Sequence, residues 1–79
     1  MIAAEVAIYP LKTNNASQVI NNSINTLHNT DVAYSIDSMN THLTGSKEEV
    51  FHCLQKMFCE AENTGGEINM VVTVTNASE

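Results

Sequence analysis

The 79-residue chain has few basic residues, few cysteines and no tryptophan. Three basic residues stand against nine acidic ones, which gives a net charge of -6. Because the phosphates of nucleic acids and anionic lipids attract basic surfaces, this balance argues against a nucleic-acid or membrane partner. Two cysteines are too few for the disulfide framework that stabilises many small secreted domains. No Gly-rich phosphate loop is present either.

The sequence shows no targeting segment and no membrane span. Residues 1–5 contain Glu5 and no basic residue, unlike a secretory signal. No apolar run approaches the roughly 20 residues that cross a bilayer. We therefore expect a cytoplasmic protein with no membrane partner. Residues 1–79 are expected to form a single domain that buries only about 60–65% of its unfolded surface, so we also expect a homo-oligomer.

Alternating apolar residues predict four strands, over residues 2–9, 32–38, 41–44 and 68–75. Pro10 ends the first strand because it has no N–H to donate, and Gly45 ends the third. The inward positions are Ile2, Val6 and Ile8 in the first strand, Val32, Tyr34 and Ile36 in the second, and Ile68, Met70, Val72 and Val74 in the last.

Apolar residues at three- and four-residue spacing predict two amphipathic helices. One covers residues 15–29. The other begins after Ser46, which forms a capping box with Glu49, and ends at Gly65-Gly66. The expected core-facing stripes are Ala16, Val19, Ile20, Ile24 and Leu27 in the first helix, and Val50, Phe51, Leu54, Met57, Phe58 and Ala61 in the second.

This order of elements predicts an α+β fold, the ferredoxin-like βαββαβ sandwich, with a four-stranded antiparallel sheet and two helices on one face. No helix remains for the other face, which we call the open face. We expect sister chains to pack on the open face, as a dimer or a tetramer. Its expected residues are Ala3, Glu5, Ala7, Ser35, Asp37, Asn69, Val71 and Thr73.

The topology also predicts where a ligand would bind. The end of the first strand, the start of the first helix and the turn between the middle strands lie at one end of such a sandwich. The helix amides there favour polar or anionic ligand atoms. The candidate ligand-binding residues are Tyr9, Thr13, Ser17, Ser38, Met39 and Thr41.

Catalytic and metal-binding arrangements are weaker candidates. The three histidines fall on different elements, and Cys53 and Cys59 do not share a helix face, so we expect no metal and no cofactor. Glu5 and Asp37 can form a carboxylate pair on the open face, and His42 is also expected there. An enzyme that uses His42 with Asp37 or Glu5 is an open but less favoured alternative. We expect a binding protein rather than an enzyme.

Several segments, taken in order, resemble the small thiamine-binding YkoF-like family over nearly the whole chain. They are Ala4-Glu5-Val6-Ala7-Ile8-Tyr9-Pro10-Leu11, Thr13, Ser17, Tyr34, Met39-Asn40-Thr41, Leu43-Thr44-Gly45, Phe51 and Val71-Val72-Thr73-Val74. The chain departs from the family at Lys12, where members often have Gly, and in its tail Asn76-Ala-Ser-Glu79, where members often have a basic residue after the last strand.

The resemblance implies a ferredoxin-like fold, oligomers built by packing sheets, and non-catalytic binding of thiamine or its hydroxymethylpyrimidine part. In that case Tyr9 and Met39 would supply an apolar wall. Hydrogen bonds would come from Thr13, Ser17, Ser38 and Thr41. The alternative is a regulatory or assembly domain of the same fold that binds a protein partner or another small effector.

Overall fold

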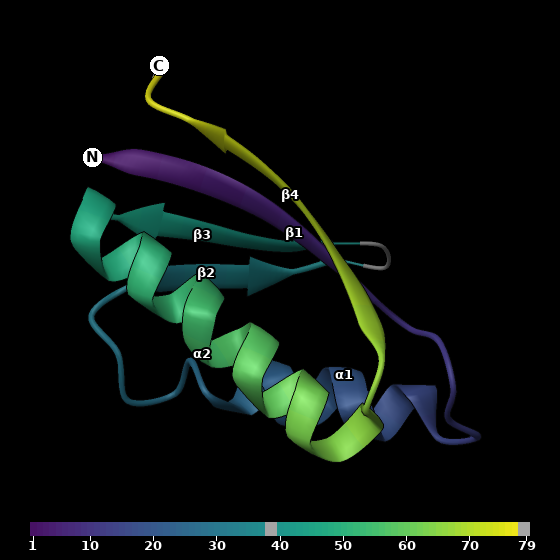
Figure 1. The fold of residues 1–79 in the computed structure, drawn as a ribbon. Coiled ribbons are helices and arrows are strands. Elements are labelled where there is room, and N and C mark those ends of the chain that lie inside the picture. Colours follow the sequence, from purple (N-terminus) through teal and green to yellow (C-terminus); the bar gives the residue numbers. More distant parts are fainter. Residues whose placement is uncertain (38–39, 78–79) are drawn as a thin grey trace.

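The computed structural model describes residues 1–37 and 40–77 and has the ferredoxin-like α+β fold that the sequence predicts. One antiparallel sheet has the strand order β2-β3-β1-β4. Both helices lie on the same side of the sheet (Figure 1). Ser38 and Met39 lie outside the described residues. The elements are β1 (Ile2–Pro10), α1 (Ala16–Asn25), β2 (Ala33–Ile36), β3 (Thr41–Gly45), α2 (Lys47–Gly65) and β4 (Ile68–Thr75).

The register of the sheet fixes which side chains share the open face. Glu5 of the inner strand β1 pairs with His42 of β3 on one side and with Thr73 of β4 on the other. His42 in turn pairs with Ser35 of the edge strand β2. These four residues therefore form one row across the open face, and His42 belongs to that face as expected.

The opposite side of the sheet carries the core. The even-numbered residues Ile2 to Ile8 of β1 are buried, as is Leu43 of β3. Ser23 of α1 is also fully buried, and its hydroxyl donates a hydrogen bond of 2.7 Å to the Met57 carbonyl oxygen of α2. This bond joins the two helices and satisfies a polar group that would otherwise be costly to bury.

The first helix is shorter than predicted, because it ends at Asn25 rather than at residue 29. Thr26 and Thr30 turn their hydroxyls back onto the carbonyl oxygens of Ser23 and Leu27, at 2.7 and 2.8 Å. Such bonds compete with helical ones, and asparagine and threonine are weak helix formers. The apolar stripe nevertheless continues beyond the helix, since Leu27 is buried.

The core-facing stripe of α2 was predicted partly wrongly. Phe51 and Phe58 are 51% and 38% exposed, whereas Cys53 is only 2% exposed. Successive residues of a helix are about 100° apart around its axis. Measured from Val50, the two phenylalanines lie about 80–100° away in one direction, and Cys53 lies about 60° away in the opposite direction. The stripe is therefore centred on Val50, Leu54, Met57 and Ala61, with Cys53 at its margin.

The two edge strands are less buried than their alternation predicts. Tyr34 and Ile36 of β2 are 36% and 54% exposed, and Val74 of β4 is 39% exposed. All three point to the helix side, but an edge strand has a neighbour on one side only. Strand β2 is also shorter than the predicted 32–38, although Val32 just before it is buried.

The ends of α2 follow the sequence signals. Ser46 is the N-cap, its Oγ accepts a hydrogen bond from the Glu49 amide at 3.2 Å, and it donates to Glu49 Oε1 at 3.0 Å. Gly66 closes the helix with φ of 75° and ψ of -116°, a conformation that favours glycine. The N-cap by Ser46 and the glycine stop are confirmed, whereas the Glu49 carboxylate accepts from the Ser46 hydroxyl and not from the Ser46 backbone amide that a capping box uses.

Candidate functional site

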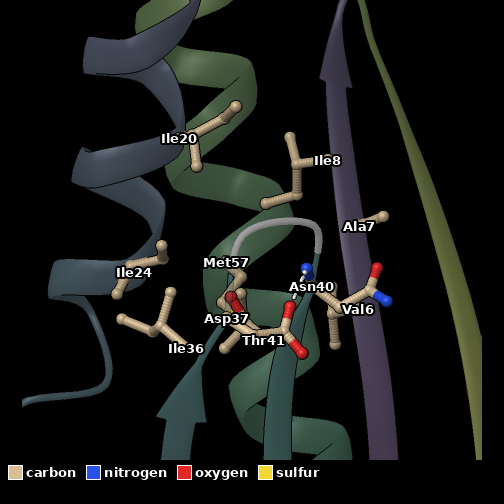
Figure 2. A pocket seen from close by; sticks show the side chains of 10 residues that line it. All are labelled: Val6, Ala7, Ile8, Ile20, Ile24, Ile36, Asp37, Asn40, Thr41 and Met57. Atoms are coloured by element: carbon tan, nitrogen blue, oxygen red, sulfur yellow. Dashed lines mark hydrogen bonds between the residues drawn. The ribbon is translucent and has the colours of Figure 1, made fainter.

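A small cavity opens between the sheet and the helices, beside the connection from β2 to β3 (Figure 2). Its volume is about 120 Å³. Four chain segments meet there. The lining residues are Val6, Ala7 and Ile8 of β1, Ile20 and Ile24 of α1, Met57 of α2, and Ile36, Asp37, Asn40 and Thr41 around the β2–β3 connection.

Most of the cavity wall is apolar because it continues the core. Val6 and Ile8 alternate toward the helices on β1, and Met57 is fully buried in the stripe of α2. Ile20 and Ile24 are one helical turn apart, so they present their side chains on the same side of α1 (Figure 2). A planar ring bound in the cavity would contact aliphatic side chains on several sides.

The polar part of the wall is formed by Asp37, Asn40 and Thr41. The Asp37 amide donates to the Asn40 carbonyl oxygen at 3.0 Å, and Asp37 Oδ1 accepts from the Asn40 amide at 2.8 Å. These two bonds hold Asp37 and Asn40 opposite each other. Thr41 follows at once and is 6% exposed, with its side chain on the helix side of β3. The Asp37 carboxylate, the Asn40 amide and the Thr41 hydroxyl thus lie at one rim of the apolar cavity.

The six ligand-binding residues predicted from the sequence are spread out. Thr41 lines the cavity. Tyr9 lies on the open face, opposite Asn69, and is 50% exposed. Thr13 accepts a hydrogen bond from the Asn15 amide and lines a separate shallow depression beside α1, and Ser17 is exposed in the first turn of α1. Ligand contact by Tyr9, Thr13 and Ser17 stays a prediction, as does contact by Ser38 and Met39, which are outside the described residues.

Sequence reasoning missed the remaining polar groups of the cavity. Asp37 was assigned to the open face, where its Oδ2 contacts His42, but its place at the cavity was missed because the strand was expected to continue to residue 38, whereas β2 ends at Ile36. Aspartate is favoured at the first position of a β-turn, and this signal was available at Asp37. Met57 was interpreted as core filler, and it is both core and cavity wall.

A second group of polar side chains lies on the open face. His42 Nε2 is 2.9 Å from Asp37 Oδ2, and His42 Nδ1 is 3.7 Å from Glu5 Oε2. His42 therefore lies between Glu5 and Asp37, the two carboxylates that the sequence allowed to form a pair. Asp37 belongs both to this group and to the cavity rim. The other histidines lie elsewhere: the His28 ring stacks near Tyr34, and His52 lies on α2.

Within residues 1–37 and 40–77, no group of three or more histidine, cysteine or acidic side chains is arranged to hold a metal ion. In the same part of the chain, no helix combines the length and the apolar character needed to cross a bilayer. Cys53 is buried and Cys59 is exposed, and both are free thiols.

Residues 1–78 match the model of a family described as YKOF-related. The chain belongs to the YKOF-related family. No curated protein matches the sequence. The family assignment thus rests on the family model, and it agrees with the resemblance found in the sequence.

Solved structures similar to this YKOF-related chain share its fold at low sequence identity. An X-ray structure of a Streptococcus pneumoniae protein has a TM-score of 0.91 at 18% identity, with 98% of this chain and 87% of that chain covered. A protein of Methanocaldococcus jannaschii has a TM-score of 0.87 at 20% identity, with coverages of 99% and 81%. At these identities the likeness shows the fold.

A third similar structure has a functional description. It is a Thermotoga maritima protein assigned provisionally to thiamine biosynthesis or salvage, with a TM-score of 0.84 at 14% identity and coverages of 96% and 83%. The description is that protein's own, and at 14% identity the likeness shows that the two chains share a fold.

Proposed function

We propose that this protein is a non-catalytic binder of thiamine or of its hydroxymethylpyrimidine part. The observation that carries the proposal is the cavity of about 120 Å³ whose apolar walls end in a polar rim. The cavity is smaller than the apolar cavity of about 150 Å³ that holds benzene in another protein, so a six-membered ring would fill it and reach into its opening. The remainder of a thiamine molecule would extend through the opening toward solvent or a second subunit.

The chemistry of an aminopyrimidine matches the rim. The ring is flat, its amino group donates hydrogen bonds and its ring nitrogens accept them. Asp37 offers carboxylate oxygens to a donor, and the Thr41 hydroxyl can both donate and accept. A thiazolium cation outside the cavity would meet a protein with a net charge of -6. The thiamine-related neighbour and the family assignment support the same ligand class.

The lining residues favour binding over catalysis. Among the described residues of the cavity wall there is no histidine, cysteine or lysine to activate a nucleophile or move a proton at neutral pH. The proposal is therefore that the ligand is held and released unchanged.

The proposal includes a second copy of the chain on the open face. The backbone of this four-stranded sheet, with strands up to nine residues long, covers an area of roughly 450 Å². The side chains on the open face add to the accessible surface of this area. Stable interfaces bury about 800 Å² of accessible surface per partner, which is of the same order. Apart from Glu5, Asp37, His42 and Tyr9, the described residues of this face are small or neutral: Ala3, Ala7, Ala33, Ser35, Thr44, Asn69, Val71, Thr73 and Thr75.

Calorimetric titration with hydroxymethylpyrimidine and with thiamine tests the ligand. We expect both to bind, and we expect Thr41→Val to weaken binding about tenfold, because the lost hydrogen bond to a buried ligand atom is worth about 1–1.5 kcal/mol. Thr44→Val is the matched control, since Thr44 lies on the same strand but on the open face. Absence of heat at millimolar ligand, or an equal loss in the Thr44 variant, would contradict the proposal.

A further inference from the structure

His42 lies outside the cavity, but its side chain reaches a residue of the cavity rim. It belongs to the inner strand β3, where it pairs with Glu5 of β1 and with Ser35 of β2. His42 Nε2 is 2.9 Å from Asp37 Oδ2, which is within hydrogen-bond distance. A carboxylate oxygen only accepts, so Nε2 donates, and a neutral imidazole with its hydrogen on Nε2 is sufficient for this bond.

The two carboxylate oxygens of Asp37 are held from different directions. Oδ1 accepts from the Asn40 amide at 2.8 Å, which Figure 2 draws as a dashed line, and Oδ2 accepts from His42. The terminal torsion of an aspartate side chain is broad, so a bond to one oxygen alone restrains the carboxylate weakly. The contact with His42 adds a second restraint. Because His42 is part of the sheet, the sheet sets the direction of the carboxylate at the cavity rim.

The direction of this carboxylate determines which groups of a ligand the rim accepts. Asp37 carries the charge among the described residues of the cavity lining. A carboxylate accepts hydrogen bonds and donates none, whereas the Thr41 hydroxyl does both. A ring with an amino group at the rim can therefore donate to Asp37. A ring with a carbonyl oxygen at the same position places two acceptors against each other, and both lose water without gaining a hydrogen bond.

The small size of the cavity strengthens this discrimination. A pyrimidine with a carbonyl oxygen in place of its amino group has an N–H on the neighbouring ring nitrogen. To donate that N–H to Asp37, the ring would have to shift sideways within its own plane. A six-membered ring already fills the cavity of about 120 Å³, so its apolar walls oppose such a shift.

We propose that His42 is a positioning residue of the cavity, and that the Asp37–His42 pair makes the cavity select a ring with an amino group at the rim over a ring with a carbonyl oxygen there. This inference rests on the proposed function and names the chemical class of ligand that the site accepts. His42 acts through Asp37 and does not touch the ligand. A carboxylate accepts about four hydrogen bonds, so the contacts with Asn40 and His42 are compatible with one from a ligand.

Calorimetric titration with hydroxymethylpyrimidine and with its oxo analogue, in which a carbonyl oxygen replaces the amino group, tests the selection. We expect the wild-type protein to bind the amino compound at least about 30-fold more tightly, because a hydrogen bond to a charged group is lost with the oxo compound. Asp37→Asn should reduce this ratio to about threefold or less, since a carboxamide presents a donor and an acceptor. The variant can still accept from the Asn40 amide, so we expect its melting temperature to be close to that of the wild type.

Replacement of His42 tests the positioning role. His42→Ala should lower the affinity for hydroxymethylpyrimidine about fivefold and leave that for the oxo analogue unchanged, because the amino compound alone uses Asp37. His42→Gln keeps an N–H that can reach Asp37, so it should restore most of the wild-type ratio. Ser35→Ala is the matched control, because Ser35 lies beside His42 on the open face and outside the cavity lining, and it should keep the wild-type ratio.

The outcomes separate the selection from ligand binding itself. Wild-type protein that binds both compounds equally, or Asp37→Asn protein that keeps the full ratio, would overturn the selection and leave ligand binding standing. An unchanged ratio in the His42→Ala variant would overturn the positioning role, and so would an equal loss of affinity for both compounds. Wild-type protein that binds neither compound at millimolar concentration would overturn the proposed function together with this inference.

Discussion

Replacement of Leu43 by alanine is expected to lower the free energy of unfolding by about 3–4 kcal/mol. Leu43 has no exposed surface and lies on the inner strand β3, on the side that the helices cover. The substitution removes apolar contacts and leaves a cavity that the surrounding strands can fill only partly. For a domain of this size, each kcal/mol lowers the melting temperature by about 4–8 °C, so we expect a fall of more than about 12 °C.

Thermal and urea unfolding followed by circular dichroism measure this effect. Thr44→Ala is the matched control, because the next residue of the same strand points to the open face and is exposed. We expect it to cost at most about 1 kcal/mol. If the two substitutions lowered the melting temperature equally, the helices would not cover the side of the sheet that carries Leu43.

The second large effect is expected when the cavity is filled from its rim. Ile36 lines the cavity and is 54% exposed, so a tryptophan at this position can be accommodated without disturbing the core. Its indole is larger than the isoleucine side chain and would occupy much of the roughly 120 Å³ available to a ligand. We expect Ile36→Trp to reduce the affinity for hydroxymethylpyrimidine by at least about 30-fold, or about 2 kcal/mol, while the fold is retained.

Tyr34→Trp is the control for this experiment. Tyr34 lies two residues earlier on β2, on the same side of the sheet, and stacks near His28 outside the lining of the cavity. We expect it to bind hydroxymethylpyrimidine as the wild type does in calorimetry. Wild-type affinity in the Ile36 variant, with its melting temperature unchanged, would place the ligand elsewhere on the protein.

The sequence predicts the fold well where a residue is buried by neighbours on both sides. The alternation of Ile2, Val6 and Ile8 identifies the core side of β1 because that strand lies between β3 and β4. At the sheet edge the same alternation overstates burial, as at Ile36. The alternation of apolar residues shows which side of a strand is apolar. How much of that side is buried depends on how far the layer of helices extends over the sheet.

The limited information in apolar spacing also explains why the core-facing stripe of α2 was predicted partly wrongly. Phe51 was expected in the core because it is large and apolar, but the orientation of α2 about its own axis is set by the whole stripe. Cys53, a smaller side chain, takes the buried position on the other margin. Helical spacing alone defines a broad arc of candidate core residues, and packing against the sheet selects which of them are covered.

Among the six ligand-binding residues predicted from the sequence, Thr41 lines the cavity, and ligand contact stays a prediction for all six. Topology alone indicated one end of the sandwich. It did not indicate Asp37, because the contribution of this residue depends on where β2 ends and on the hydrogen bonds with Asn40. The residue at which a strand ends and a loop begins is set by such local hydrogen bonds. The alternation of apolar and polar residues does not contain this information.

An NMR titration of the ¹⁵N-labelled protein with hydroxymethylpyrimidine locates the ligand directly. We expect the amide signals of Ile36, Asn40 and Thr41 to shift most and to saturate together, with the neighbouring amides of Ile20 and Ile24 following them. Signals of the open face, such as those of Val71 and Thr73, should respond less. Shifts concentrated on the open face, or no saturable shift at millimolar ligand, would contradict binding in the cavity.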